Sequence, residues 1–157
     1  MIFDSVRFGE IEVDDDSCIE FIGPILGFEH HQKFVLLDEP EVRPLQWLQS
    51  ADDPTLCLPV IEPYLLVPEY DIEVPDHEVE ALELARAEDA CILCIVVLAK
   101  DSDEVRMNLC APIVINLCSR TAKQVVLSGS EQPIQFRFRD ETAAMDMVGK
   151  EAVGASA

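Results

Sequence analysis

The sequence predicts an all-β fold, a single antiparallel β-barrel-like domain with one short α-helix. Short apolar and β-branched segments recur roughly every ten residues with turn residues between them, which is the pattern of antiparallel sandwiches and barrels. Only residues 76–88 carry the start signal and apolar spacing of a helix. The length of 157 residues suits one domain with its own core. We expect this domain to span residues 1–139 and residues 140–157 to form a loose C-terminal tail.

The expected strands are short, and each is bounded by turn residues. Residues 91–99 are apolar throughout, which is typical of a central strand buried on both faces. Pro59 lacks an N–H group, so it should confine its strand to a sheet edge or break it. We expect turns at 101–104, 119–121 and 128–130. The predicted strands are residues 6–8, 11–13, 18–21, 34–37, 45–48, 56–61, 91–99, 105–109, 113–117, 124–127 and 134–138.

The one expected helix follows a proline-rich segment, residues 63–75, that we expect to be an extended loop. Asp76 is placed to cap the free N–H groups of the first helical turn. Glu78, Glu80 and Glu83 would lie in the half where the helix dipole favours negative charge. A short helix needs docking for stability, and Val79, Leu82 and the aliphatic stem of Arg86 would supply the docking stripe.

Acidic residues dominate the charge. The chain has 31 acidic and 11 basic residues, a formal net charge of −20. Between Phe8 and Ala85 there are 20 acids and only two bases, Lys33 and Arg43. This charge repels nucleic acid and anionic membranes, so we expect neither as a direct partner. It either attracts basic proteins or serves solubility alone, and composition leaves both open.

Two features predict a cytoplasmic protein with reduced cysteines. The first residues, Met1 to Asp4, lack the basic and apolar segments of a signal peptide. No apolar run approaches the ~20 residues that span a bilayer. Cys91 and Cys94 form a C-x-x-C, but residues three apart in a strand point to opposite faces. We therefore interpret the cysteines as structural.

The sequence carries no recognisable catalytic or cofactor motif. Glycine-rich phosphate loops are absent, and His30, His31 and His77 lack a metal-ligand spacing. The acidic runs at 14–16 and 101–104 lack the glycine and glutamate of a calcium loop. We expect no enzyme activity, cofactor or metal. A small hydrolase or isomerase with a carboxylate site inside the barrel remains the alternative, and a deep pocket with convergent polar groups would favour it.

Six short motifs follow one another in a fixed order along the chain. They are Phe21–Glu29 (F-I-G-P-I-L-G-F-E), Phe34–Leu37 (F-V-L-L), Trp47–Pro54 (W-L-Q-S-A-D-D-P), Pro68–Tyr70 (P-E-Y), Asn108–Asn116 (N-L-C-A-P-I-V-I-N) and Gln124–Leu127 (Q-V-V-L). With these motifs the sequence resembles the flagellar assembly factor FliW family over residues 6–138. The departures are Pro24, where the family has a glycine, and Glu62-Pro63, where it has Asp-Pro.

The resemblance implies a non-catalytic binder with two protein partners, flagellin and the RNA-binding translational regulator CsrA. Flagellin would be held before export and CsrA antagonised, so that flagellin synthesis follows export. A basic RNA-binding protein is a fitting partner for a chain of net charge −20. An acidic nucleic-acid mimic that blocks another basic protein is a further alternative. The family-motif residues are Gly27, Phe28, Trp47, Asn108, Pro112 and Asn116, and each also has a purely structural interpretation.

We predict that the segment from Glu62 to Glu83 meets CsrA, because it holds eight acids and no lysine or arginine. With Asp76 set aside as a cap and Glu78 counted as free, seven carboxylates could face a partner. Four apolar residues could supply anchors beside them: Tyr64, Leu65, Leu66 and Tyr70. The alternative is that these acids only keep the surface of the segment hydrated and that its apolar residues pack inward. The residues singled out for partner binding are Glu69, Tyr70, Asp71, Glu73, Glu80 and Glu83.

Overall fold

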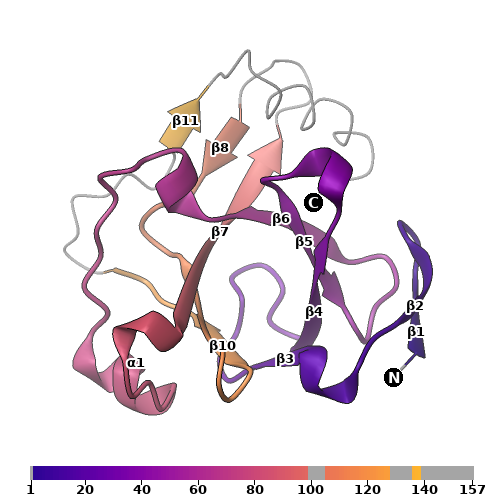
Figure 1. Cartoon of the computed structure of the whole chain (residues 1–157), viewed down its shortest axis with the longest axis horizontal. Helices are drawn as coiled ribbons and strands as arrows, with labels where there is room; N and C mark the ends of the chain where they lie inside the picture. Colours follow the sequence, from indigo (N-terminus) through magenta and orange to yellow (C-terminus); the bar gives the residue numbers. More distant parts are fainter. Residues whose placement is uncertain (1, 99–104, 128–135, 139–157) are drawn as a thin grey trace.

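The computed structural model describes residues 2–98, 105–127 and 136–138. Seven of its strands close into a barrel in the order β3–β4–β5–β6–β7–β9–β10, with β10 returning to β3 (Figure 1). The β3–β10 pair is parallel and the other barrel pairs are antiparallel. This confirms the predicted β-barrel. The barrel strands are β3 (Cys18–Phe21), β4 (Lys33–Asp38), β5 (Gln46–Ser50), β6 (Cys57–Ile61), β7 (Ala90–Leu98), β9 (Ile113–Asn116) and β10 (Thr121–Gln124).

The remaining elements surround the barrel. Strands β1 (Ile2–Ser5) and β2 (Gly9–Glu12) form a separate hairpin, at the right of Figure 1. Strands β8 (Val105–Met107) and β11 (Phe136–Phe138) extend the sheet from the far end of β7. Helix α1 (Asp76–Ala81) lies near the start of β7. Four 3-10 turns complete the described chain: Asp15–Ser17, Pro40–Val42, Pro63–Leu65 and Ala87–Asp89. No helix among the described residues is long and apolar enough to cross a membrane.

The barrel interior is filled by an apolar cluster to which all seven barrel strands contribute. Alternate residues of each strand point inward, as the period of two requires. Among the described residues the only buried carboxylate is that of Glu78, which belongs to α1. The buried members of the interior cluster are Ile19, Phe21, Ile25, Phe34, Leu48, Leu58, Val60, Leu93, Ile113, Ile115 and Ala122.

Two further apolar clusters lie on the outside of the barrel. One covers β5, β6 and β7 and is centred on Trp47, Tyr70 and Met107. The other joins Leu82, just after α1, to Val114 of β9 and to Val125. Together the outer clusters bury the second face of β7, which explains why its sequence is apolar throughout.

The helix is shorter than predicted. It ends at Ala81 instead of 88, because Glu83 takes a left-handed backbone conformation with φ of 54° that no α-helix continues. Asp76 does not cap it. Pro75 occupies the cap position, Asp76 is the first helical residue, and no side chain bonds the free N–H groups. Arg86 therefore lies outside the helix and is exposed.

Two strand predictions also need correction. Residues 6–8, expected as a strand, form the turn between β1 and β2. The tenth strand is Thr121–Gln124, not 124–127, because Thr121 and Ala122 pair with β3. Val125 and Leu127 instead donate backbone hydrogen bonds to the carbonyls of Pro112 and Cys110. Pro59 does not break β6, because it pairs with Trp47 of β5. It lies outside the ladder to β7, which includes only Val60 and Ile61. The predicted turns at 101–104 and 128–130 and the tail at 140–157 lie outside the described residues.

Candidate functional site: an acid-rimmed groove beside strand β7

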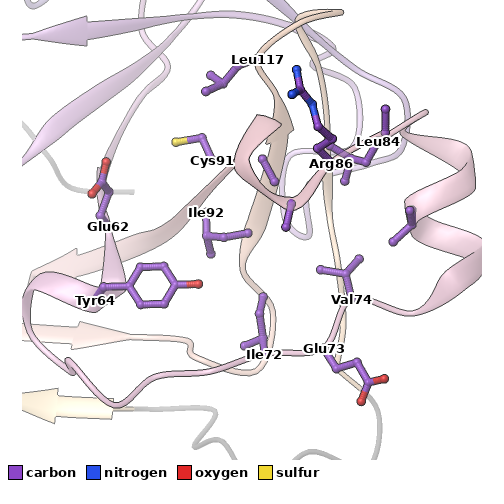
Figure 2. Close-up of a pocket in the computed structure, with 14 residues that line it drawn as sticks. Glu62, Tyr64, Ile72, Glu73, Val74, Leu84, Arg86, Cys91, Ile92 and Leu117 are labelled. Atoms are coloured by element: carbon purple, nitrogen blue, oxygen red, sulfur yellow. The ribbon is translucent and has the colours of Figure 1, made fainter.

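A groove of about 690 Å³ lies beside the start of β7. Figure 2 shows Cys91 and Ile92 of β7 between two walls, one with Glu62 and Tyr64 and the other with Leu84 and Arg86. Ile72 and Val74 close the side formed by the loop before α1. The lining is mostly apolar, and its charged groups, Glu62, Glu73 and Arg86, are all exposed side chains. We call this feature the β7 groove.

Two exposed carboxylates, those of Glu62 and Glu73, line the β7 groove, and further exposed acids lie in the same segment of the chain. The exposed acids between Glu62 and Glu83 have no salt bridge to a lysine or arginine in the described part of the chain. Arg86 is partly neutralised, because its guanidinium lies 3.4 Å from Glu88 and 3.8 Å from Asp89. The rim therefore carries net negative charge. The exposed acids of this segment are Glu62, Glu69, Asp71, Glu73, Asp76, Glu80 and Glu83.

Tyr64 and Leu117 are the exposed large apolar side chains that line the β7 groove, at 40% and 46% exposure. Burial raises the pKa of the Tyr64 hydroxyl, and the nearby carboxylates of Asp71 and Glu62 raise it further. The Tyr64 ring packs edge-on against Tyr70, with ring centroids 5.7 Å apart. Tyr64 thus combines an apolar ring with two neighbouring negative charges, which suits an anchor for a basic partner.

Tyr70, singled out as a partner contact, is only 3% exposed. Its hydroxyl donates a hydrogen bond to the Leu109 carbonyl at 2.7 Å, and its ring belongs to the outer cluster with Trp47. Tyr70 therefore fixes the loop onto the barrel. It is not an exposed anchor, because its ring and its hydroxyl are both engaged in these contacts.

Glu78, counted as a free carboxylate from sequence, is 6% exposed and paired with Lys123 of β10 at 2.5 Å. The aliphatic chain of Lys123 passes Gly23, where an added Cβ would lie 3.2 Å from the Lys123 Cε atom. Gly23 therefore leaves the space that lets Lys123 reach the helix. Sequence analysis missed this pair, since nothing in the sequence links residues 45 positions apart.

The first of the family-like motifs, Phe21–Glu29, contains a loop that β10 holds in place. Gly27 has φ of 91°, a left-handed conformation that favours glycine. Phe28 packs against the barrel-interior cluster. The side-chain carbonyl of Gln124 accepts a hydrogen bond from the Leu26 N–H at 2.8 Å, and its amide nitrogen donates to the Ala111 carbonyl at 3.1 Å. Gln124 therefore joins this loop to the bend that contains Pro112.

The two motif asparagines hold turns. Asn108 accepts a hydrogen bond from the Cys110 N–H at 2.9 Å. Asn116 is buried, donates to the Leu82 carbonyl at 2.8 Å, and accepts from the Cys118 N–H at 2.9 Å. Asn116 thus ties the end of α1 to the barrel. Pro112 is also buried. These contacts supply the structural interpretation for each residue.

Trp47 is fully buried, and the Arg7 guanidinium carbon lies 3.8 Å from its ring centroid. The sequence had left open whether Trp47 contacts a partner or packs in the core. In the free protein it packs, with Phe8 edge-on against it at 6.3 Å between ring centroids.

The two cysteines of the C-x-x-C, Cys91 and Cys94, pack among apolar side chains. Burial raises the pKa of the Cys94 thiol to about 12. Burial, with Glu62 next in effect, also raises the pKa of Cys91. Both thiols are therefore poor nucleophiles near neutral pH. Cys94 packs in an outer cluster and Cys91 against the interior one, as their strand spacing predicted. Among the described residues, no three His, Cys, Asp or Glu side chains gather as a metal site.

The predicted partner-binding residues are brought together only in part. Glu73 lines the β7 groove and Asp71 approaches Tyr64, whereas Glu80 and Glu83 are exposed on and after α1. Glu69 is exposed on the same loop. Sequence analysis missed the apolar floor, because Leu84, Cys91 and Leu117 come from segments that only the fold assembles.

Comparison with known proteins gives consistent results. The family described as FliW protein matches residues 2–138. The flagellar assembly factor FliW of Syntrophus aciditrophicus is 39% identical over 136 residues, covering 87% of this chain and 86% of the relative. That of Caldicellulosiruptor saccharolyticus is 37% identical over 129 residues, covering 82% and 84%. A crystal structure of the flagellar assembly factor FliW superposes with a TM-score of 0.81 at 31% identity, covering 90% of this chain and all of that one. The chain therefore belongs to the FliW family.

Proposed function

We propose that this protein is a cytoplasmic flagellar assembly factor that acts by binding proteins and catalyses no reaction. Its partners are flagellin, held before export, and the translational regulator CsrA, which it antagonises. The two compete, so flagellin synthesis follows export. The observation that supports the binding role is the β7 groove, a mostly apolar surface whose two lining carboxylates, Glu62 and Glu73, have no lysine or arginine partner among the described residues.

Charge and surface shape support a binding role over catalysis. Among the described residues, Glu78 is the only buried carboxylate, and its partner is Lys123. Glu78 belongs to α1 and the described buried side chains of the barrel interior are apolar, so no described residue supports the alternative of a carboxylate site inside the barrel. The β7 groove has the volume of a small-molecule site, but its charged groups stand at the rim and do not converge.

The test is direct binding. Tagged protein is used to capture partners from a lysate of a flagellated bacterium, and purified flagellin and CsrA are then titrated separately and in competition. Both should bind, and excess flagellin should release CsrA. If neither protein binds, the proposal is wrong, and capture of another basic protein alone would favour the nucleic-acid mimic.

Charge reversal tests the acidic segment. Glu69→Lys with Asp71→Lys should slow association with CsrA and flatten its salt dependence, because exposed charges act mainly on encounter. The matched control reverses Glu10 and Glu12 of β2, which are equally exposed but belong to the separate hairpin. Equal kinetics for both variants at low salt would place the CsrA interface elsewhere.

A further inference from the structure

The edge of β7 that faces the groove lacks a neighbouring strand. On this edge β6 pairs only through Ile61 with Cys94 and Val60 with Ile95. Continuing that register would place Pro63 opposite Ile92, but Pro63 begins a 3-10 turn and has no N–H to donate. The chain leaves the sheet there, and the first residues of β7 are paired on one side only.

The hydrogen-bond pattern shows which backbone groups are left. In an antiparallel ladder, residues that exchange bonds with one neighbour alternate with residues whose groups point the other way. The Leu117 N–H donates to the Asp89 carbonyl at 2.9 Å, in the register that pairs Cys91 with Ile115. Cys91 and Leu93 therefore bond to β9, and the groups of Ala90 and Ile92 point toward the β7 groove.

Three backbone groups then remain without a partner in the described chain. The Ala90 N–H already has a hydrogen-bond partner, because it donates to the Ala87 carbonyl. The ladder to β6 begins only at Cys94, and no backbone bond outside the ladders involves the Ala90 carbonyl or either group of Ile92, so these three groups lack a backbone partner among the described residues. The groove lining agrees, because it includes Ala90, Cys91 and Ile92 in succession. Successive side chains lie on opposite faces of a strand, so a groove lined by all three meets the strand at its edge.

We propose that the β7 groove binds an extended, basic segment of a partner protein, which adds to the barrel as a strand beside Ala90–Ile92. Backbone hydrogen bonds to Ile92 hold the segment, and its apolar side chains pack on Ile72, Tyr64 and neighbouring groups. The occupant is basic because the rim carries Glu62 and Glu73, while Arg86 is engaged by its own acidic neighbours. A second copy of this chain, with net charge −20, would be repelled.

This inference rests on the proposed protein-binding role and adds the chemistry and binding mode of the partner. The probe is the peptide acetyl-Lys-Val-Lys-Val-Lys-Val-Lys-amide, titrated into the isotopically labelled full chain and followed by nuclear magnetic resonance. In the free protein, the Ile92 amide should exchange with solvent faster than those of Cys91 and Leu93. Bound peptide should slow exchange at Ile92 by about tenfold or more, leaving Cys91 and Leu93 unchanged.

Two chemically matched peptides test strand addition itself. N-methylation of alternate amides blocks one edge of a strand, so either the lysine or the valine amides are methylated. One form should lose about tenfold or more in affinity, and the other should keep it, since only one edge faces β7. Equal binding by both forms, equal loss by both, or no binding of the unmodified peptide would overturn the proposal.

Protein variants test the charge component. Glu62→Lys with Glu73→Lys should weaken the basic peptide about tenfold at low salt, and Glu10→Lys with Glu12→Lys should not. Equal effects from both pairs would mean that the peptide does not bind at the groove. Binding of flagellin or CsrA without protection of Ile92 would leave the proposed function intact and exclude this site. If neither flagellin nor CsrA binds, the proposed function is wrong. The peptide titration still tests whether a strand adds at the β7 groove.

Discussion

The ion pair between Glu78 and Lys123 should be the main electrostatic attachment of α1 to the barrel. Glu78 is buried on a helix of six residues, too short to be stable alone. The change Lys123→Met keeps the length of the side chain but removes its charge. The variant leaves the Glu78 carboxylate buried without its cation. This destabilises the folded state only, because in the unfolded chain the carboxylate is in water.

The magnitude follows from the exposure of the two partners. Removing one member of a buried pair costs about 3–5 kcal/mol. The Lys123 side chain is 29% exposed, so water relieves part of the penalty. We therefore expect a loss of about 3 kcal/mol in the free energy of unfolding, at the lower end of that range. For a chain of this size, about 2–4 °C per kcal/mol makes this a fall in Tm of about 6–12 °C.

The assay is denaturant and thermal unfolding of a double-mutant cycle. Glu78→Leu combined with Lys123→Met replaces the pair by apolar groups and should recover most of the loss. Lys33→Met, at an exposed lysine of β4, is the control and should change stability by less than about 0.5 kcal/mol. A loss of less than about 1 kcal/mol for Lys123→Met, or no recovery in the double variant, would refute the reasoning.

Three further predictions concern single positions. Gly27→Ala should cost about 1–2 kcal/mol through backbone strain alone, because nothing lies within 4 Å of the added Cβ, and Gly27→Asn should cost less in the same unfolding assay. Asn116→Ala should lower the free energy of unfolding by about 1–3 kcal/mol, since it leaves buried groups unpaired, and Asn108→Ala should lower it less. In native protein at pH 8, a thiol reagent should label exposed Cys118 and spare Cys94, whose raised pKa of about 12 keeps it protonated; mass spectrometry of the labelled sites would contradict this if Cys94 reacted first.

The local periodicity of the sequence was sufficient to predict the class of fold. Most expected strands lie within a residue or two of observed ones, because short apolar, β-branched segments with turn residues at each end favour a buried strand over a helix. Errors arose where tertiary contacts outweigh local preference. The helix has favourable composition through Arg86, yet it ends at Ala81, where Asn116 binds the Leu82 carbonyl.

The candidate site could likewise be predicted only in part from the sequence. Its acidity is a property of composition, and the lack of lysine or arginine between Glu62 and Glu83 makes that segment negative in any fold. Which carboxylates are free could not be predicted, because Glu78 is neutralised by Lys123 through a contact across 45 positions. The burial of Tyr70 depends in the same way on the Leu109 carbonyl.

The sequence by itself determined the β-class, the negative charge and the family, since these depend on periodicity, composition and motif order. Only the tertiary structure decided where β6 and β7 separate. The prolines at 59 and 63 mark residues without an N–H, but a missing donor matters only once a neighbouring strand is placed opposite it. The exposed edge at Ile92 follows from the register of three strands distant in sequence, and pairing between distant segments is information that no local pattern contains.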